Sequence, residues 1–372
     1  LPGFEGTETN FALARYISTT GALDPTFADD GLVTTDFSSL SGSTDTAAAT
    51  VVQADGKILV AGFTRLGFGA SQGVVSRYNT DGKLDPTFGA NGQITIGAFN
   101  SNGITGITLG AATGNPATQP IYVTGTVFNQ ITFRNDIAVA SITASGEFNT
   151  AFGANGIALA EFPQNTTAEA IAIQTVNNVE LIVAAGHTQI AGNNSDFAVA
   201  RFNASTGLLD TAGFNAGPNG GRQTIAFDTA GNNDDRAFDV QIASNNDILL
   251  AGYASVTAAN EHDFAIARLV VTGTAANFGT NGKRTINTST TATGNDEARS
   301  LAIEGSGATE KIYVGGFADG TDNQDFAIVK IPGNGNGNDG SFGTAGIKLQ
   351  DFRAGINSDE QLFDLKLQGG NI

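Results

Sequence analysis

Carboxylates stand at two recurring places in the chain, and they are the side chains best suited to chemistry. One set precedes the first strand of each repeating unit: Asp45, Asp234, Asp235, Asp296, Glu297, Asp359 and Glu360. The other precedes the third strand: Asp136, Asp196, Asp263 and Asp325. Hard cations such as calcium take several oxygen ligands, and carboxylates supply them. We therefore predict a metal site built from Asp45, Asp235, Asp296 and Asp359, with calcium as the candidate cofactor.

A structural role for the same carboxylates is the competing hypothesis. Each aspartate would then cap a local turn or pair with an arginine on a neighbouring strand. The arginines in question are Arg15, Arg77, Arg201 and Arg268. On this hypothesis the acids fix the chain and bind no ion.

Histidine chemistry has little to build on, because the chain contains 2 histidines. His187 occupies the place that Phe63 and Tyr253 hold in other units, which indicates a rim side chain in an aromatic position. His262 lies between Glu261 and Asp263, an arrangement that would suit a general base or a metal ligand. No Ser-His-Asp set can be assembled, and no pair of carboxylates stands out for glycoside cleavage. The sequence therefore singles out no catalytic residue.

The elements that position these side chains come from a repeat. The segment 84–92 occurs six times in varied form, and its aromatic residue recurs at intervals of 61, 64, 62, 64 and 64 residues. The six rings are Phe27, Phe88, Phe152, Phe214, Phe278 and Phe342. A period this constant indicates one supersecondary unit copied along the chain.

Each unit contains four short strands, as the second unit illustrates. Apolar runs at 47–53, 57–62, 74–78 and 93–99 are separated by turn sequences such as Asp55-Gly56. Four-stranded units of this length, repeated around an axis, make a β-propeller. A linear β-solenoid is the alternative, but its coils are usually shorter. We expect the recurring Phe to pack between neighbouring blades.

The sequence thus predicts an all-β protein whose residues 1–372 form a single six-bladed β-propeller of four-stranded blades. One blade would be a composite of both termini. In it, residues 362–368 supply the first strand, and residues 368–372 together with 1–4 complete the second. The junction could form within one chain or between neighbouring molecules, and the latter would produce a filament.

Composition restricts the partners and the location. The net charge of −18 repels phosphate backbones and anionic lipid, so nucleic acid is excluded as a partner. No apolar run is long enough for membrane insertion. The absence of Cys, Met and Trp removes thiol chemistry and is typical of a protein exposed outside the cell. We expect an extracellular or cell-surface location.

Three motifs resemble one known repeat family. They are LDPTFGANG at 84–92, QADGKILVAG at 53–62 and DFAVARF at 196–202, and they are similar to the delta-60 repeat family. The resemblance covers nearly the whole chain. It implies bacterial, mostly secreted or surface-associated repeats that form a β-propeller, and it implies no common catalytic residues.

Two functions follow as expectations. The main one is a non-catalytic propeller that serves as a cell-surface or matrix structural or binding module. Its partners would be a surface glycan or protein, or further copies of itself in a homo-oligomer or filament. The alternative is a calcium-dependent lyase or hydrolase that acts on polysaccharide through the acidic face.

Overall fold

The computed structural model describes residues 9–37, 43–66, 69, 71–99, 102–111, 115–190, 192, 194–227, 234–256, 261–289, 294–320, 323–352, 359–368 and 371–372. The chain divides into two compact units. Unit 1 contains residues 1–161 and 204–208, and unit 2 contains residues 162–203 and 209–372. The predicted single body of residues 1–372 stays a prediction.

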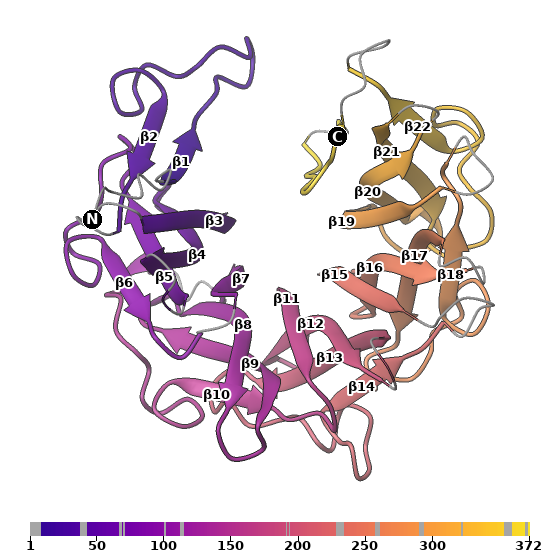
Figure 1. The fold of residues 1–372 in the computed structure, drawn as a ribbon, viewed down its shortest axis with the longest axis horizontal. Coiled ribbons are helices and arrows are strands. Elements are labelled where there is room, and N and C mark those ends of the chain that lie inside the picture. The colour runs from indigo at the N-terminus through magenta and orange to yellow at the C-terminus, as the bar shows by residue number, and fades with distance from the viewer. Residues whose placement is uncertain are drawn as a thin grey trace, which may run out of the picture. The chain divides into compact units, whose positions relative to one another are not determined.

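The described residues form one two-stranded and five four-stranded antiparallel sheets (Figure 1). Unit 1 contains β1 (Phe11–Ala14), β2 (Leu32–Thr35), β3 (Ser43–Val52), β4 (Ile58–Leu66), β5 (Gln72–Tyr78), β6 (Gln93–Ile96), β7 (Ile104–Leu109), β8 (Ile121–Asn129), β9 (Arg134–Ile142) and β10 (Ile157–Ala160). Unit 2 contains β11 (Thr166–Val176), β12 (Val179–Gln189), β13 (Ser195–Asn203), β14 (Arg222–Ile225), β15 (Asp235–Ile242), β16 (Ile248–Ser255), β17 (His262–Leu269), β18 (Lys283–Ile286), β19 (Asp296–Glu304), β20 (Lys311–Asp319), β21 (Gln324–Pro332) and β22 (Ile347–Gln350).

Each four-stranded sheet is an up-and-down meander in chain order, such as β11-β12-β13-β14. Within each unit the sheets stand next to one another, with their first strands on the same side (Figure 1). The apolar cores lie between neighbouring sheets. One core joins Phe264 of β17 to Leu301 of β19, and another joins Val199 of β13 to Val240 of β15. These residues alternate with side chains of the opposite face, as strand geometry requires.

Five of the six recurring Phe side chains pack as predicted, while Phe342 is only partly buried. Phe27, Phe88, Phe152, Phe214 and Phe278 are at most 1% exposed. The turn glycine that follows the third strand of the next sheet makes room for each ring. Gly273 has a φ of +87°, and a Cβ there would lie 2.9 Å from the ring of Phe214. Both the backbone angle and the neighbouring ring therefore exclude other residues at this turn.

An arginine of the third strand fixes the connector beneath the same ring. The guanidinium of Arg77 lies 4.7 Å from the centroid of Phe88 and donates to Asp85 Oδ2 at 2.7 Å. Arg15 and Arg201 repeat the arrangement with Asp24 and Asp210. These three arginines have aspartate partners in the connectors, whereas Arg268 binds Asp247 and Glu310. None of these acids belongs to the acidic sets that the sequence singled out.

The predicted first strand at 362–368 is wrong in its conformation. Residues 359–367 have no regular secondary structure, and Gln368 makes a single bridge with Asn371. The segment nevertheless packs where a first strand would, because Leu362 and Leu365 lie against Tyr313 and Gly315 of β20. Among the described residues the segment pairs with no neighbouring strand, so it forms no ladder there.

The observed architecture is all-β and β-propeller-like, with two short 3₁₀ turns as the helical residues that are described. The predicted composite blade depends on residues 1–4, which lie outside the described residues. β1 and β2 correspond to the third and fourth strands of that blade. No described helix is long and apolar enough to cross a membrane.

Candidate functional site

Three of the predicted metal ligands take part in the same repeated contact. Asp45, Asp235 and Asp296 are at most 2% exposed at the start of a first strand. Each carboxylate accepts a hydrogen bond from a backbone N–H that follows the fourth strand of the preceding sheet. The donors are Phe37 at 2.9 Å, Phe227 at 2.7 Å and Thr288 at 2.6 Å. These carboxylates therefore connect successive sheets, which is a structural role.

The fourth predicted ligand, Asp359, lies one residue before the equivalent position. Glu360 takes that position, since its N–H donates to Gln324 O at 2.8 Å as Asp45 N–H donates to Thr9 O at 2.8 Å. Asp359 accepts from Gln324 N–H at 3.3 Å. Asp45, Asp235, Asp296 and Asp359 do not form one group among the described carboxylates close enough to share an ion. Their role as calcium ligands stays a prediction.

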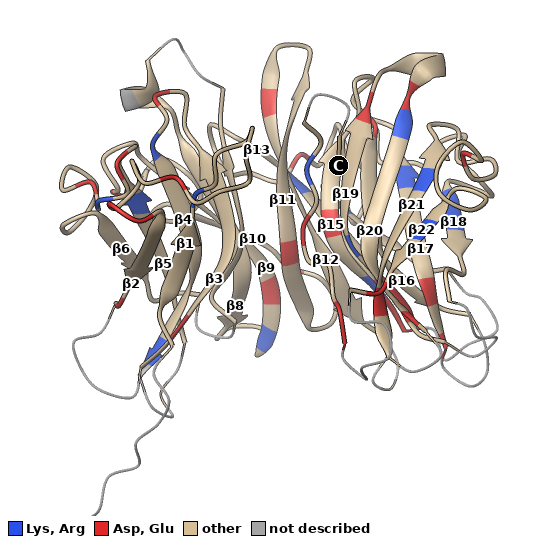
Figure 2. Ribbon diagram, turned by 90° about the horizontal axis from the view of Figure 1, so that it is seen from above, with Lys and Arg blue, Asp and Glu red and all other residues tan. Residues whose placement is uncertain are grey.

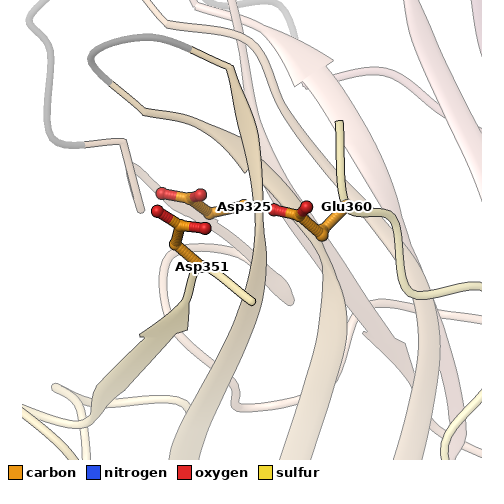
Figure 3. A group of neighbouring side chains, drawn as sticks. All are labelled: Asp325, Asp351 and Glu360. Carbon is orange, nitrogen blue, oxygen red and sulfur yellow. The ribbon is translucent and has the colours of Figure 1, made fainter. Parts of the chain in front are cut away.

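A different carboxylate group has the spacing of a metal site. Oxygen atoms of Asp325, Asp351 and Glu360 lie within 4.8 Å of one another (Figure 3). Burial, and then the charges of Asp351 and Glu360, raise the pKa of Asp325. Asp351 stands where the preceding sheet has Asn287, an amide that hydrogen-bonds to Asp263. The acidic sets predicted from the sequence include Asp325 and Glu360 but not Asp351.

We expect calcium to raise the melting temperature of the wild-type protein and chelator to lower it, because an ion that binds the folded state stabilises it. Asp351→Asn recreates the neighbouring amide and should abolish the calcium effect. In chelator the variant should be more stable than wild type by about 1 kcal/mol, since a like charge is removed. Calorimetry with and without calcium measures both.

Asp81→Asn, at an exposed turn, is the matched control and should keep the calcium response. A calcium response that persists in Asp351→Asn would place the ion elsewhere. No response in wild type would contradict the prediction of calcium binding.

A second cluster lies at the beginning of the first strands of unit 2 and owes its form to β-bulges. The register shifts between Ala168 and Ala170 in β11, between Ala237 and Asp239 in β15, and at the matching point of β19. The bulged residues are Glu169, Phe238 and Arg299. Bulges of this kind re-aim side chains and are frequent next to active sites.

We name the polar group around these bulges the inner-strand cluster. It consists of Glu169, His187, Asp234, Arg236, Tyr253, His262, Glu297 and Arg299. Figure 2 shows acidic residues near the ends of the strands in this unit. Apart from Tyr253, which is 4% exposed, the side chains are partly exposed, from 13% for His187 to 37% for Arg236, so solvent reaches the group.

Contacts across β15, β16, β17 and β19 hold the charged half of the cluster. Tyr253 OH donates to Asp234 Oδ2 at 2.9 Å, and its ring stacks on His262 with the centroids 3.9 Å apart. His262 Nδ1 lies 3.8 Å from Glu297 Oε1, and Arg299 donates to the other oxygen of Glu297. Burial raises the pKa of Tyr253, so this hydroxyl keeps its proton.

Glu169 and His187 form the other half of the cluster, in which burial disfavours the charged forms. Burial raises the pKa of Glu169 to about 7, against the opposing charges of Arg299 and Arg236. Burial, followed by the charge of Arg236, lowers the pKa of His187 to about 4. Glu169 Oε1 and His187 Nδ1 are 3.7 Å apart. At pH 7 the histidine is neutral, and the carboxyl group is protonated in about half of the molecules.

Sequence reasoning found part of this cluster. It named Asp234 and Glu297 among the acids, and it placed His187 in an aromatic position, which the register confirms because Thr167–His187 matches Arg236–Tyr253. It considered Glu261 and Asp263 beside His262 but did not foresee Glu297, whose Oε1 lies 3.8 Å from His262 Nδ1. It missed Glu169. The available signal was a charged residue where earlier units have Ala48 and Thr105.

The arrangement can perform acid–base chemistry. A carboxyl group that holds its proton near pH 7 can donate it, and a second carboxylate kept ionised by an arginine can accept one. Glu169 has the first property. Glu297, bound to Arg299, has the geometry for the second.

Comparison with known proteins gives one family model and several structures. A model described as "Domain of unknown function (DUF5122) beta-propeller" matches residues 53–88 and 182–212. It supports a β-propeller family, while the resemblance to delta-60 repeats stays a prediction. No curated protein sequence is significantly similar to the chain.

Three similar solved structures are glycoside hydrolases. An α-L-arabinofuranosidase from Fusarium graminearum has a TM-score of 0.45 and 11% identity, covering 82% of this chain and 80% of its own. An exo-1,5-α-L-arabinanase from a bovine ruminal metagenomic library has a TM-score of 0.29 and 13% identity. The match covers 66% of this chain and 78% of the arabinanase. A β-xylosidase/α-arabinofuranosidase from a compost metagenome has a TM-score of 0.32 and 9% identity. The match covers 72% of this chain and 85% of that enzyme.

These similarities correct the main functional expectation. The sequence predicted a non-catalytic structural or binding module, and this prediction is contradicted because the matching solved structures are hydrolases. With TM-scores below 0.5 the matches carry no information on the substrate or mechanism of this chain. Both have to be argued from its own residues.

Proposed function

We propose that the protein is a hydrolase of polysaccharide and that the inner-strand cluster is its active site. The observation that carries the proposal is the pair of carboxyl groups around Arg236 and Arg299. Both arginines act on Glu169, Arg299 binds Glu297, and the charge of Glu297 in turn acts on Arg236. The two acids thus share a neighbourhood but differ in their environment, which is the arrangement that separates an acid from a base.

The chemistry assigns one role to each acid. Glu169 donates its proton to the glycosidic oxygen as the bond to the sugar carbon breaks. Glu297 accepts a proton from the water that adds to that carbon, so the two new ends receive the atoms of one water molecule. Arg299 binds Glu297, and the burial of Glu169 favours its protonated form.

Release of reducing ends from a set of polysaccharides tests the proposal: arabinan, xylan, polygalacturonate and alginate. Wild-type protein should cleave at least one of them. Glu297→Gln should lower kcat by about 10²–10⁴-fold, the range for loss of a general base. Glu180→Gln is the matched control, because Glu180 lies opposite Thr175 at the other end of the β11–β12 hairpin.

Two outcomes contradict the proposal. One is the absence of cleavage for every polysaccharide with folded protein, and the other is equal activity of wild type and Glu297→Gln. Polysaccharides of this kind occur outside cells, which supports the extracellular or cell-surface location expected from the composition. Calcium remains the proposed cofactor, to be tested at Asp351 as described above.

A further inference from the structure

Arg236 and Arg299 are unusual in this chain, which has 18 basic and 36 acidic residues. They lie on the first strands of neighbouring sheets, β15 and β19. Arg236 is two residues before the bulged Phe238, and Arg299 is itself a bulged residue. Both are partly exposed, 37% and 25%. Two guanidinium groups therefore face the same solvent-reached region in a protein whose net charge repels anions.

Arg299 is held in a fixed orientation. Its guanidinium carbon lies 4.0 Å from the ring centroid of Phe238 and 5.4 Å from that of Phe317. Phe317 is 3% exposed on β20, opposite Glu297, so it provides a rigid support. A guanidinium fixed by aromatic rings loses little conformational entropy when it binds a ligand.

Both arginines keep unused donors. Arg299 donates to Glu297 through Nη2, and its buried Nε has no hydrogen-bond partner. Arg236 donates to Asp234 through Nε at 3.1 Å. A guanidinium has five N–H donors, so each of these has several left among the described contacts. Two such forks match the planar carboxylate of a sugar acid in bidentate fashion.

The local charges allow an anion to bind when Glu169 is protonated. Asp234 and Glu297 then balance Arg236 and Arg299. An anion near Glu169 further favours the protonated carboxyl group, which is the form that donates a proton. Binding of an acidic sugar and protonation of Glu169 therefore favour each other.

We propose that the inner-strand cluster binds an acidic polysaccharide, and that Arg236 and Arg299 bind the carboxylate of a uronic acid unit. This rests on the proposed function for the site but can be tested without catalysis. The geometry that carries it is Arg299, held against two aromatic rings and partly exposed, together with Arg236, whose charge acts on the same Glu169.

The test is calorimetric titration of wild-type protein with a galacturonate oligosaccharide and with its methyl-esterified form. The esterified form has the same rings without the charge. We expect the acid to bind at least about tenfold more tightly, in line with charge-assisted hydrogen bonds to two guanidinium groups. Arg299→Gln should remove this preference, and Arg299→Lys should restore part of it.

Arg134→Gln is the matched control, because Arg134 is an exposed arginine on β9 outside the cluster and its loss changes the net charge equally. It should keep the preference at the same ionic strength. Circular dichroism of each variant confirms that it is folded.

The outcomes separate this inference from the proposed function. Selective binding of the acid without cleavage would contradict the hydrolase proposal and leave the binding assignment in place. Equal binding of acid and ester, or unchanged selectivity in Arg299→Gln, would overturn the assignment. Cleavage of neutral polysaccharide alone would do the same and leave the hydrolase proposal standing.

Discussion

Replacement of Arg201 with alanine is expected to lower the free energy of unfolding by about 3–5 kcal/mol, the cost of breaking a buried ion pair by removing one partner. Arg201 is 1% exposed and donates to Asp210 Oδ2 at 2.9 and 2.6 Å. It also donates to Gln174 Oε1 at 2.8 Å and to Val271 O at 2.6 Å. The substitution leaves three acceptors without their donor and a cavity beside Phe214.

Urea denaturation followed by far-ultraviolet circular dichroism measures the effect, since the chain has no Trp to report by fluorescence. Arg15→Ala is the matched control. Arg15 has the same connector contacts with Asp24 and Phe27, but its side chain is 30% exposed. Its loss should cost about 1 kcal/mol or less, as expected for an exposed pair. Equal losses at the two positions would show that burial does not set the cost.

Glu169→Gln is expected to lower kcat/KM by about 10²–10⁴-fold if Glu169 is the general acid. The wild-type rate should fall as the pH rises above about 7, because the carboxyl group with a pKa of about 7 loses its proton. Burial raises this pKa, and the charges of Arg299 on β19 and Arg236 on β15 oppose the rise. The variant should lack the alkaline limb. A limb that persists in Glu169→Gln would assign the proton to another group.

The same substitution has a readout that needs no substrate. The folded-state pKa of Glu169 is raised from 4.5 to about 7. Its contribution to stability is therefore complete below pH 4.5 and is lost as the pH rises through 7. The variant should gain stability relative to wild type across this interval, as followed by melting temperature against pH. Glu180→Gln should show no such trend.

The fold was largely predictable because the chain repeats one four-stranded unit with a nearly constant period. The period of Phe27 to Phe342 announces the repeat, and turn glycines such as Gly273 occur where a positive φ and a neighbouring ring demand them. Local patterns sufficed for the four strands of each sheet. They failed at 362–368, which pairs with no strand among the described residues, because strand formation depends on a partner as well as on local sequence.

The site was less predictable, for a physical reason. Glu169 and Arg299 become neighbours of the same groups only through bulges and through the packing of different sheets. The cluster at Asp325 likewise needs Asp351, which lies at the end of a fourth strand and was not in either acidic set. Arg77 pairs with Asp85 across only a short loop, yet the acidic sets from which the sequence hypothesis drew its aspartates did not include Asp85. Long-range contacts between side chains leave little trace in local spacing.

The bulge recurs at the same register in all five four-stranded sheets, with Ala48, Thr105, Glu169, Phe238 and Arg299 as the extra residues. Such a residue makes no hydrogen-bonded pair with the neighbouring strand, so its side chain can change without disturbing the residue pairs on either side of it. The bulge position can therefore carry different side chains in different repeats. A reactive residue can be introduced at one repeat while the strand pairing of the other repeats is unchanged. Ala48 and Thr105 are bulge positions with small side chains, and substitutions there are a direct way to engineer a second binding specificity.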